Sequence, residues 1–215
     1  MNVLLFGPPG SGKGTQAADL AERLEIPHVA TGDIFRKNLR EGTSLGVLAK
    51  SFMDKGNLVP DSVTCEMVAD RLLQPDAVNG ALLDGFPRTV PQTEWLLGWL
   101  EERASKIDVV VNLIVPNAVI VDRVTGRRSC TNCGSTYHIR NAPPRADGTC
   151  KKCDSKVVQR KDDQEDVVVT RLETYARDTA PILAVLKGRS IIHDIDGVGE
   201  IVAVQDRIRA ALALG

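Results

Sequence analysis

The segment from residue 7 to residue 15 reads Gly-Pro-Pro-Gly-Ser-Gly-Lys-Gly-Thr and separates an apolar run, residues 3–6, from a helical pattern. A strand, a glycine-rich loop and a helix N-terminus in this order wrap backbone N–H groups around a polyphosphate. Glycine permits the tight turn and the close approach of an anion, and Lys13 adds a mobile positive charge. The segment therefore predicts a nucleotide site, with a plain strand-to-helix turn as the weaker alternative.

The loop departs from the general phosphate-loop pattern at one position. That pattern places Ser or Thr directly after the Lys, whereas Gly14 follows Lys13 here and the hydroxyl comes one residue later, at Thr15. The departure indicates a particular class of phosphate loop. It also argues against direct ligation of a magnesium ion by a loop hydroxyl.

Outside the loop, short apolar runs alternate with helical sequence. Strands are predicted at residues 2–6, 81–84, 109–115 and 190–193. Helices are predicted at residues 13–24, 31–40, 45–55, 60–73, 91–102, 117–127, 163–186 and 199–214. This alternation predicts an α/β fold in which helices cover both faces of a central parallel sheet.

The balance of charge excludes some partners. Lys and Arg together number 27 and Asp and Glu 28, so no overall positive field recruits nucleic acid or an anionic membrane. No apolar stretch approaches the length that spans a bilayer, and the N-terminus has no pattern of a secretory leader. We therefore expect a cytoplasmic protein that binds neither nucleic acid nor membrane.

Residues 128–160 do not follow the helix and strand pattern, because they are polar and contain four of the five cysteines. The spacing Cys-x-x-Cys, a gap of 16 residues, then Cys-x-x-Cys is typical of a zinc ribbon, here with Cys130, Cys133, Cys150 and Cys153 as ligands. Four protein ligands leave no open position, so the metal would be structural, although thiolates also take iron or cobalt. Two reduced cysteine pairs are the alternative.

Two single residues near this pattern have simpler interpretations. His138 lies close to the cysteines in sequence, but four thiolates already complete a tetrahedral shell, so we expect a polar neighbour. Cys65 stands alone in a helical pattern and is expected to be a buried thiol.

Several arginines stand at positions that suggest a second anion. Arg88 follows the strand predicted at 81–84, at the carboxyl end where open α/β sheets bind ligands. Arg123 and Arg127 are four residues apart in a predicted helix and would share a face, and Arg160 and Arg171 follow the insert. One such arginine alone is usually part of a surface ion pair, but the set needs another explanation.

Five strings, in this order and at these spacings, resemble the adenylate kinase family over nearly the whole chain. They are the loop at 7–15, Thr31-Gly32-Asp33 with Arg36, Asp84-Gly85-Phe86-Pro87-Arg88 with Gln92, Asp122-Arg123 with Gly126-Arg127-Arg128, and Arg160-Lys161-Asp162-Asp163. Gly14 is normal in this family. The insert resembles the lid of the long, bacterial-type enzymes in its metal-carrying form.

The resemblance implies transfer of the terminal phosphoryl group of Mg-ATP to AMP, giving two ADP and serving adenine nucleotide homeostasis. It implies a three-layer fold like that of the phosphate-loop nucleoside triphosphate hydrolases, with a zinc-ribbon-like lid. The implied catalytic cations are Lys13, Arg88, Arg123, Arg160 and Arg171. The implied ATP-binding residues are Gly10, Ser11, Gly12, Lys13, Gly14, Thr15, Arg127, Thr136, Tyr137 and Gly199.

The same resemblance implies an AMP site formed by Thr31, Arg36, Asn57, Leu58, Val59, Gly85, Phe86, Pro87, Arg88, Gln92, Arg160 and Arg171. Asp33 and Asp84 would orient the waters of Mg²⁺, and the four lid cysteines would hold Zn²⁺. The Phe86-Pro87 bond is expected to be cis. The apolar run at 167–169 is less charged than is usual in the family and is expected to pack against the core.

The implied organisation is a core of residues 1–29, 60–125 and 164–215, a flap of residues 30–59 that closes on AMP, and a lid of residues 126–163 that closes on ATP. We expect a monomer. Three other functions remain as alternatives: a kinase for UMP, CMP or a deoxynucleotide; a phosphate-loop ATPase or switch without an acceptor site; and a nucleic-acid-binding zinc ribbon that uses Arg140, Arg145, Lys151 and Lys152. Gln92 and the long lid argue against the first.

Overall fold

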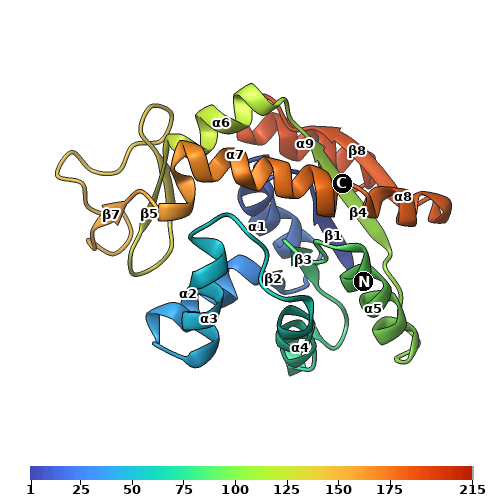
Figure 1. Cartoon of the computed structure of the whole chain (residues 1–215). Helices are drawn as coiled ribbons and strands as arrows, with labels where there is room; N and C mark the ends of the chain where they lie inside the picture. Colours follow the sequence, from blue (N-terminus) through green and yellow to red (C-terminus); the bar gives the residue numbers. More distant parts are fainter. Residues whose placement is uncertain (215) are drawn as a thin grey trace.

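A computed structural model describes residues 1–214 and has a central parallel sheet, as the sequence predicts (Figure 1). Its strand order is β2-β3-β1-β4-β8. The strands are β1 Val3–Phe6, β2 His28–Ala30, β3 Leu82–Asp84, β4 Val109–Ile114 and β8 Ile192–Asp196. The parallel pairing brings the carboxyl ends of β1 and β3 together, because Leu5 lies opposite Asp84.

Helices cover both faces of this sheet. Their bounds are α1 Lys13–Arg23, α2 Thr31–Arg40, α3 Ser44–Met53, α4 Asp61–Leu72, α5 Val90–Glu101, α6 Asn117–Thr125, α7 Glu165–Thr174, α8 Ile182–Leu186 and α9 Ile201–Ala211. Short turns of 3-10 helix lie at η1 Pro75–Ala77, η2 Lys161–Asp163 and η4 Lys187–Arg189. Within residues 1–214, none of the helices is long and apolar enough to cross a membrane.

The side chains of β1 show how one apolar run serves two cores. Successive residues of a strand point to opposite faces, so Val3 and Leu5 pack with α1 and α9, whereas Leu4 and Phe6 pack with α4, α5 and α8. All four residues are buried. A continuous apolar strand is what a parallel sheet covered on both faces requires.

Two strands differ from the sequence prediction. No pattern predicts β2, because its three residues are too short to show a period of two. The strand predicted at 190–193 is β8, which begins two residues later and continues to Asp196. It is one of the two edge strands of the sheet, and its partly exposed polar residues hide it from a search for apolar runs.

The prediction of one helix at 117–127 was wrong at its end. Helix α6 ends at Thr125, Gly126 caps it, and Arg127 begins strand β5, so Arg123 and Arg127 do not share a helix face. A Cβ at Gly126 would lie 2.1 Å from His138 Nε2, so the close packing of the lid against the end of α6 favours glycine at this position.

The helix predicted at 163–186 is divided. Helix α7 is followed by a π-helical segment, η3 Tyr175–Thr179, in which the N–H of Ala180 bonds to the carbonyl of Tyr175 five residues earlier. Pro181 has no N–H to continue the α-helical ladder, and α8 begins after it. Of the apolar run at 167–169, only Val168 is fully buried, in a cluster with residues of α6.

The insert forms a small antiparallel sheet of its own, with order β6-β5-β7. Its strands are β5 Arg127–Cys130, β6 Thr136–His138 and β7 Val157–Val158. Figure 1 shows this sheet projecting at the left, with the flap helices α2 and α3 lower in the view. The Phe86-Pro87 bond is cis, as expected.

Candidate active site

The glycine-rich loop joins the end of β1 to the start of α1. Gly7, Gly10 and Gly12 have φ values of 135°, 85° and 101°, a region that side chains rarely adopt. At Gly10 a Cβ would also lie 2.3 Å from the Val124 side chain, so only glycine fits. The first amides of α1 have no partner within the helix and are available to an anion.

Lys13 folds back over this loop. Its Nζ donates to the carbonyl oxygens of Gly7 at 2.7 Å and Pro8 at 2.9 Å. The pKa of Lys13 is lowered to about 8, mainly by burial; the charge of Asp84 acts to raise it, and those of Arg88, Arg171 and Arg127 act to lower it. The ammonium is therefore costly to keep in this site until an anion binds beside it.

Asp84 ends β3 and faces the loop. A Cβ at Gly14 would lie 3.7 Å from Asp84 Oδ2, and that oxygen is 3.4 Å from His28 Nε2. Burial acts to raise the pKa of Asp84, but the hydrogen bond from His28 and the charge of Lys13 outweigh it, so the pKa is lowered. A charged carboxylate beside the loop suits the waters around Mg²⁺, which keeps several of them in protein sites.

Asp33, the other carboxylate expected near Mg²⁺, is exposed and accepts a hydrogen bond from Arg36 Nη2 at 2.6 Å. Ser11 contributes only its backbone to the loop surface, since its side chain is buried and its hydroxyl has no hydrogen-bond partner within residues 1–214. Arg123 Nη1 lies 3.4 Å from the Ser11 carbonyl oxygen.

Two arginines of the lid and of α7 share one buried carboxylate. The Asp163 side chain is 0% exposed and accepts from Arg127 Nε at 2.9 Å, and Arg127 Nη2 donates to its other oxygen. Arg171 Nη1 donates to the Asp162 carbonyl at 2.8 Å and lies 3.5 Å from Asp163 Oδ1. Residues of η2 thus position both guanidinium groups.

Six cations act on one another electrostatically and are called the cation cluster here: Lys13, Arg36, Arg88, Arg127, Arg160 and Arg171. Burial lowers the pKa of Arg160 and of Arg171 to about 10, with neighbouring arginines adding to the effect. Burial also lowers the pKa of Arg88. Buried, mutually repelling cations are typical of a site whose ligand brings the compensating negative charge.

A small cavity of about 40 Å³ lies beside Arg88. A water molecule needs on the order of 10–15 Å³, so the cavity has room for a few waters and not for a purine base. It is lined by Thr31, Gly32, Phe35, Met53, Leu58, Val59, Thr64, Gly85, Arg88 and Gln92. Six residues expected to bind AMP, from four separate segments, therefore lie around one cavity.

Gly85 and Thr31 shape this cavity. Gly85 has a φ of 76°, and a Cβ there would lie 2.7 Å from Arg88 Nη2, so a side chain would displace the guanidinium. Thr31 Oγ1 donates to the Gly85 carbonyl at 2.8 Å. Phe86 and Pro87 are buried and do not line the cavity, and Asn57 is exposed.

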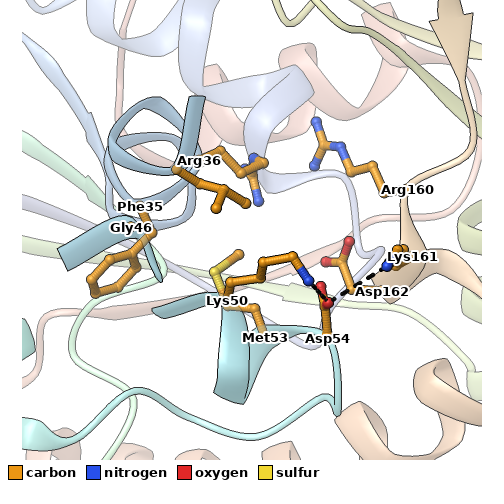
Figure 2. Close-up of a pocket in the computed structure, with 10 residues that line it drawn as sticks. Phe35, Arg36, Gly46, Lys50, Met53, Asp54, Arg160, Lys161 and Asp162 are labelled. Carbon is orange, nitrogen blue, oxygen red and sulfur yellow. Dashed lines mark hydrogen bonds and ion pairs between the residues drawn. The ribbon is translucent and has the colours of Figure 1, made fainter. Parts of the chain in front are cut away.

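A larger cavity of about 260 Å³ lies between the flap and the end of the lid (Figure 2). Arg36 and Arg160 line it, together with Lys50, Asp54 and Lys161. Asp54 pairs with Lys50 and is 4.0 Å from Lys161, which links the flap to the lid. The cavity therefore adjoins the cation cluster.

The four lid cysteines converge, with all their sulfur atoms within 4.8 Å of one another. The Sγ atoms of Cys130 and Cys153 are 3.4 Å apart, and those of Cys133 and Cys150 are 3.6 Å apart. Four sulfurs each about 2.3 Å from one zinc ion would lie about 3.8 Å apart, so the cluster fits a tetrahedral metal. This geometry disfavours two independent reduced pairs.

The contact with ATP expected of Thr136, Tyr137 and Gly199 stays a prediction. The Tyr137 hydroxyl is 3.2 Å from Cys150 Sγ and lowers the pKa of that thiol, so its side chain belongs to the cysteine cluster. Thr136 and Gly199 are exposed. His138 is not part of the cluster, as expected, and Cys65 is buried.

Comparison with known proteins shows the family to which this chain is similar. The sequence profile of the adenylate kinase family matches residues 5–191. The chain belongs to the adenylate kinase family. It is 50% identical over 212 residues to the adenylate kinase of Caldanaerobacter subterraneus subsp. tengcongensis, covering 99% of this chain and 96% of that protein. It is 51% identical to the adenylate kinase of Clostridium perfringens strain SM101, covering 97% and 96%, and 47% identical to that of Methanocella arvoryzae, covering 99% and 98%.

The resemblance, the α/β fold and the assignment to phosphotransferases are thus confirmed. The sequence did not reveal the carboxylates that hold the functional groups of this family member. His28 pairs with Asp84, Asp163 with Arg127, and Asp61 with Gln92. Asp84 had a signal as the first residue of its string and an expected role near Mg²⁺, but not the contact with His28; Asp162 and Asp163 had only their place in the string after Arg160, and Asp61 had no signal.

Proposed function

We propose that the chain catalyses the reversible transfer of the terminal phosphoryl group from Mg-ATP to AMP, which gives two ADP. The observation that carries this proposal is one cation cluster that extends from the phosphate loop at Lys13 to Arg88 at the small cavity. A site with a loop for one polyphosphate and a separate pocket for a second nucleotide suits phosphoryl transfer between the two. A hydrolase needs no such pocket.

The residues act mainly by alignment and charge. The acceptor is a phosphate oxygen of AMP, which is already ionised, so no general base is required. Lys13 and Arg127 would hold ATP, Arg88 and Arg36 the AMP phosphate, and Arg123, Arg160 and Arg171 would surround the transferred group. Planar guanidinium forks suit phosphate oxygens. Bound Mg²⁺, with its waters oriented by Asp84 and Asp33, supplies charge neutralisation at the phosphates.

Motion is part of the proposal. The cavity beside Gln92 is smaller than a base, so residues 30–59 must move outward to admit AMP. Residues 126–163 would close on ATP over a core of residues 1–29, 60–125 and 164–215. Closure excludes water, which would otherwise accept the phosphoryl group, and reopening limits turnover. The Asp54 and Lys161 contact is one link that forms between the two moving parts.

The four cysteines would hold a structural Zn²⁺ that keeps the lid folded and does not touch the nucleotides. We also propose that the enzyme works as a cytoplasmic monomer, because one chain supplies both nucleotide sites. Its partners would then be ATP, AMP and ADP alone.

The test is ADP formation from Mg-ATP with a panel of monophosphates, AMP, UMP, CMP and dTMP, followed by separation of the products. We expect AMP to be the preferred acceptor and ADP to form in a ratio of two for each ATP consumed. ADP formation without any monophosphate would indicate an ATPase. Failure with AMP alone would overturn the proposal.

A further inference from the structure

The side-chain amide of Gln92 is held from two sides at the wall of the small cavity. Gln92 lies in the first turn of α5 and is 1% exposed. Its Oε1 accepts a hydrogen bond from the backbone N–H of Arg88 at 2.7 Å, and its Nε2 donates to Asp61 Oδ1 at 2.7 Å. The amide keeps one further N–H and one further acceptor position for a ligand.

Asp61 is itself fixed in place. It is the first residue of α4, separated from the flap by Pro60 alone, and its Oδ2 accepts from Thr89 Oγ1 at 2.9 Å. Thr89 caps α5 and accepts from the N–H of Gln92 at 3.2 Å. Each oxygen of the Asp61 carboxylate therefore has its own donor, one of them the Gln92 amide.

This arrangement permits only one orientation of the amide. If the Gln92 amide turned over, its oxygen would face the Asp61 carboxylate and its NH₂ group would face the N–H of Arg88. Both contacts would place like groups together and leave buried polar atoms unpaired, which is costly. The free N–H and the free acceptor are thus presented to the cavity in a fixed order.

The order matters for the choice of base. A 6-aminopurine has a donor at its amino group and an acceptor at N1, whereas a 6-oxopurine has an acceptor at O6 and a donor at N1. We propose that Asp61 is a positioning residue that fixes the Gln92 amide, and that this selects 6-aminopurine monophosphates over 6-oxopurine monophosphates. The inference rests on the proposed function and adds a residue that does not itself line the cavity.

A purely structural role for Asp61 predicts something different. Asp61 also ties α4 to α5 through Thr89, and losing that contact alone would lower the activity with every acceptor in the same proportion. A role in positioning Gln92 changes the ratio between acceptors, because only the orientation of the amide distinguishes them. The ratio is therefore the informative quantity.

The experiment compares kcat/KM for AMP and for IMP in the unmodified chain, in Asp61→Asn and in Asp70→Asn. An Asn at position 61 can turn its own N–H toward Gln92 Oε1 and so removes one of the two contacts that fix the amide, leaving that with the Arg88 N–H. We expect Asp61→Asn to narrow the AMP-to-IMP ratio by about tenfold or more. Asp70→Asn removes the same charge from an exposed position of α4 and should leave the ratio unchanged. An unchanged ratio in Asp61→Asn would overturn the inference.

A second measurement uses the unmodified chain and does not depend on the folding of a variant. The Gln92 side-chain amide is assigned by its absence in Gln92→Leu. It should show one proton that exchanges with solvent far more slowly than those of the exposed Gln164. Exchange of both protons at the Gln164 rate would contradict the Asp61 contact. If the chain made no ADP from ATP and AMP, the proposed function would fail, and this measurement would still decide how the amide is held.

Discussion

The cation cluster and the cysteine cluster differ in how the chain holds them together. The four sulfurs come from 24 consecutive residues, 130–153, in one small sheet. The six cations come from separate elements between residues 13 and 171, and two of them, Arg127 and Arg171, are held by the carboxylates of Asp163 and Asp162. The first cluster is local and suits a resident metal, whereas the second depends on the whole fold and suits a substrate that arrives and leaves. We therefore assign stability to the cysteine cluster and catalysis to the cation cluster.

Removal of one guanidinium from the cation cluster should have the largest effect on activity. Arg160 has no ion-pair partner within residues 1–214, so Arg160→Met leaves no carboxylate unpaired. We expect kcat to fall by roughly 10²–10³-fold, the cost of losing one charge-stabilising donor. The melting temperature should stay close to that of the unmodified chain.

Steady-state rates and thermal melts check this prediction. Arg145→Met is the matched control, because Arg145 is exposed in the lid and pairs with Asp154 outside the cation cluster. A small loss of rate together with a large loss of melting temperature for Arg160→Met would mean that this arginine serves stability. The assignment of catalysis to the cation cluster would then be wrong.

A carboxylate that holds the cation cluster should affect both properties. Asp163→Asn removes a fully buried charge that pairs with Arg127 and lies 3.5 Å from Arg171. Breaking a buried pair leaves an uncompensated charge, so we expect the free energy of unfolding to fall by about 3 kcal/mol. The rate should fall as well, because two guanidinium groups lose their positions. Urea unfolding measures the first effect, and the exposed Asp166→Asn is the control.

The same contrast explains what the sequence could predict. The cysteine spacing determines the geometry of its cluster, because two short turns bring four thiols together whatever the rest of the chain does. The phosphate loop and most helices follow equally from local patterns. Strand β2 does not, because three residues show no period, and Arg127 was placed on a helix that Gly126 ends.

Partners that are distant in sequence form the unpredictable part of the site. Asp61 and Gln92 are 31 residues apart, and His28 and Asp84 are 56 apart, so only the folded sheet brings them together. Tyr137 is a further case, because the resemblance implies a nucleotide contact and gives no sign that its hydroxyl lies against Cys150. Roles that depend on a side chain's direction require the structure.

Metal removal should change stability and leave activity nearly unchanged. We expect a chelator to lower the melting temperature by several degrees, because the lid sheet has only a small apolar cluster of its own. The rate at a cool assay temperature, measured after the chelator is removed and Mg²⁺ restored, should change less than about twofold if the metal does not touch substrate. Added Zn²⁺ should restore the melt. Loss of activity with unchanged melting would contradict the assignment.

The smallest expected effect is the uptake of a proton by Lys13 when ATP binds. It tests whether the negative charge of the ligand favours the protonated form of this lysine. Burial lowers the pKa of Lys13 from 10.5 to about 8, so the free folded protein loses this proton as the pH rises through that value. Phosphates favour the ammonium form, and binding should therefore take up about 0.1 proton at pH 7 and about 0.9 at pH 9 if the bound lysine is fully protonated.

Between pH 8 and 10.5 the unfolded chain holds more protons at this lysine than the folded one, so its contribution to stability rises with pH there. Weaker binding at high pH would thus not reflect unfolding. Calorimetry of Mg-ATP binding in buffers of different ionisation enthalpy counts the protons, and equal uptake at both pH values would mean that the pKa of Lys13 is not lowered in the free protein.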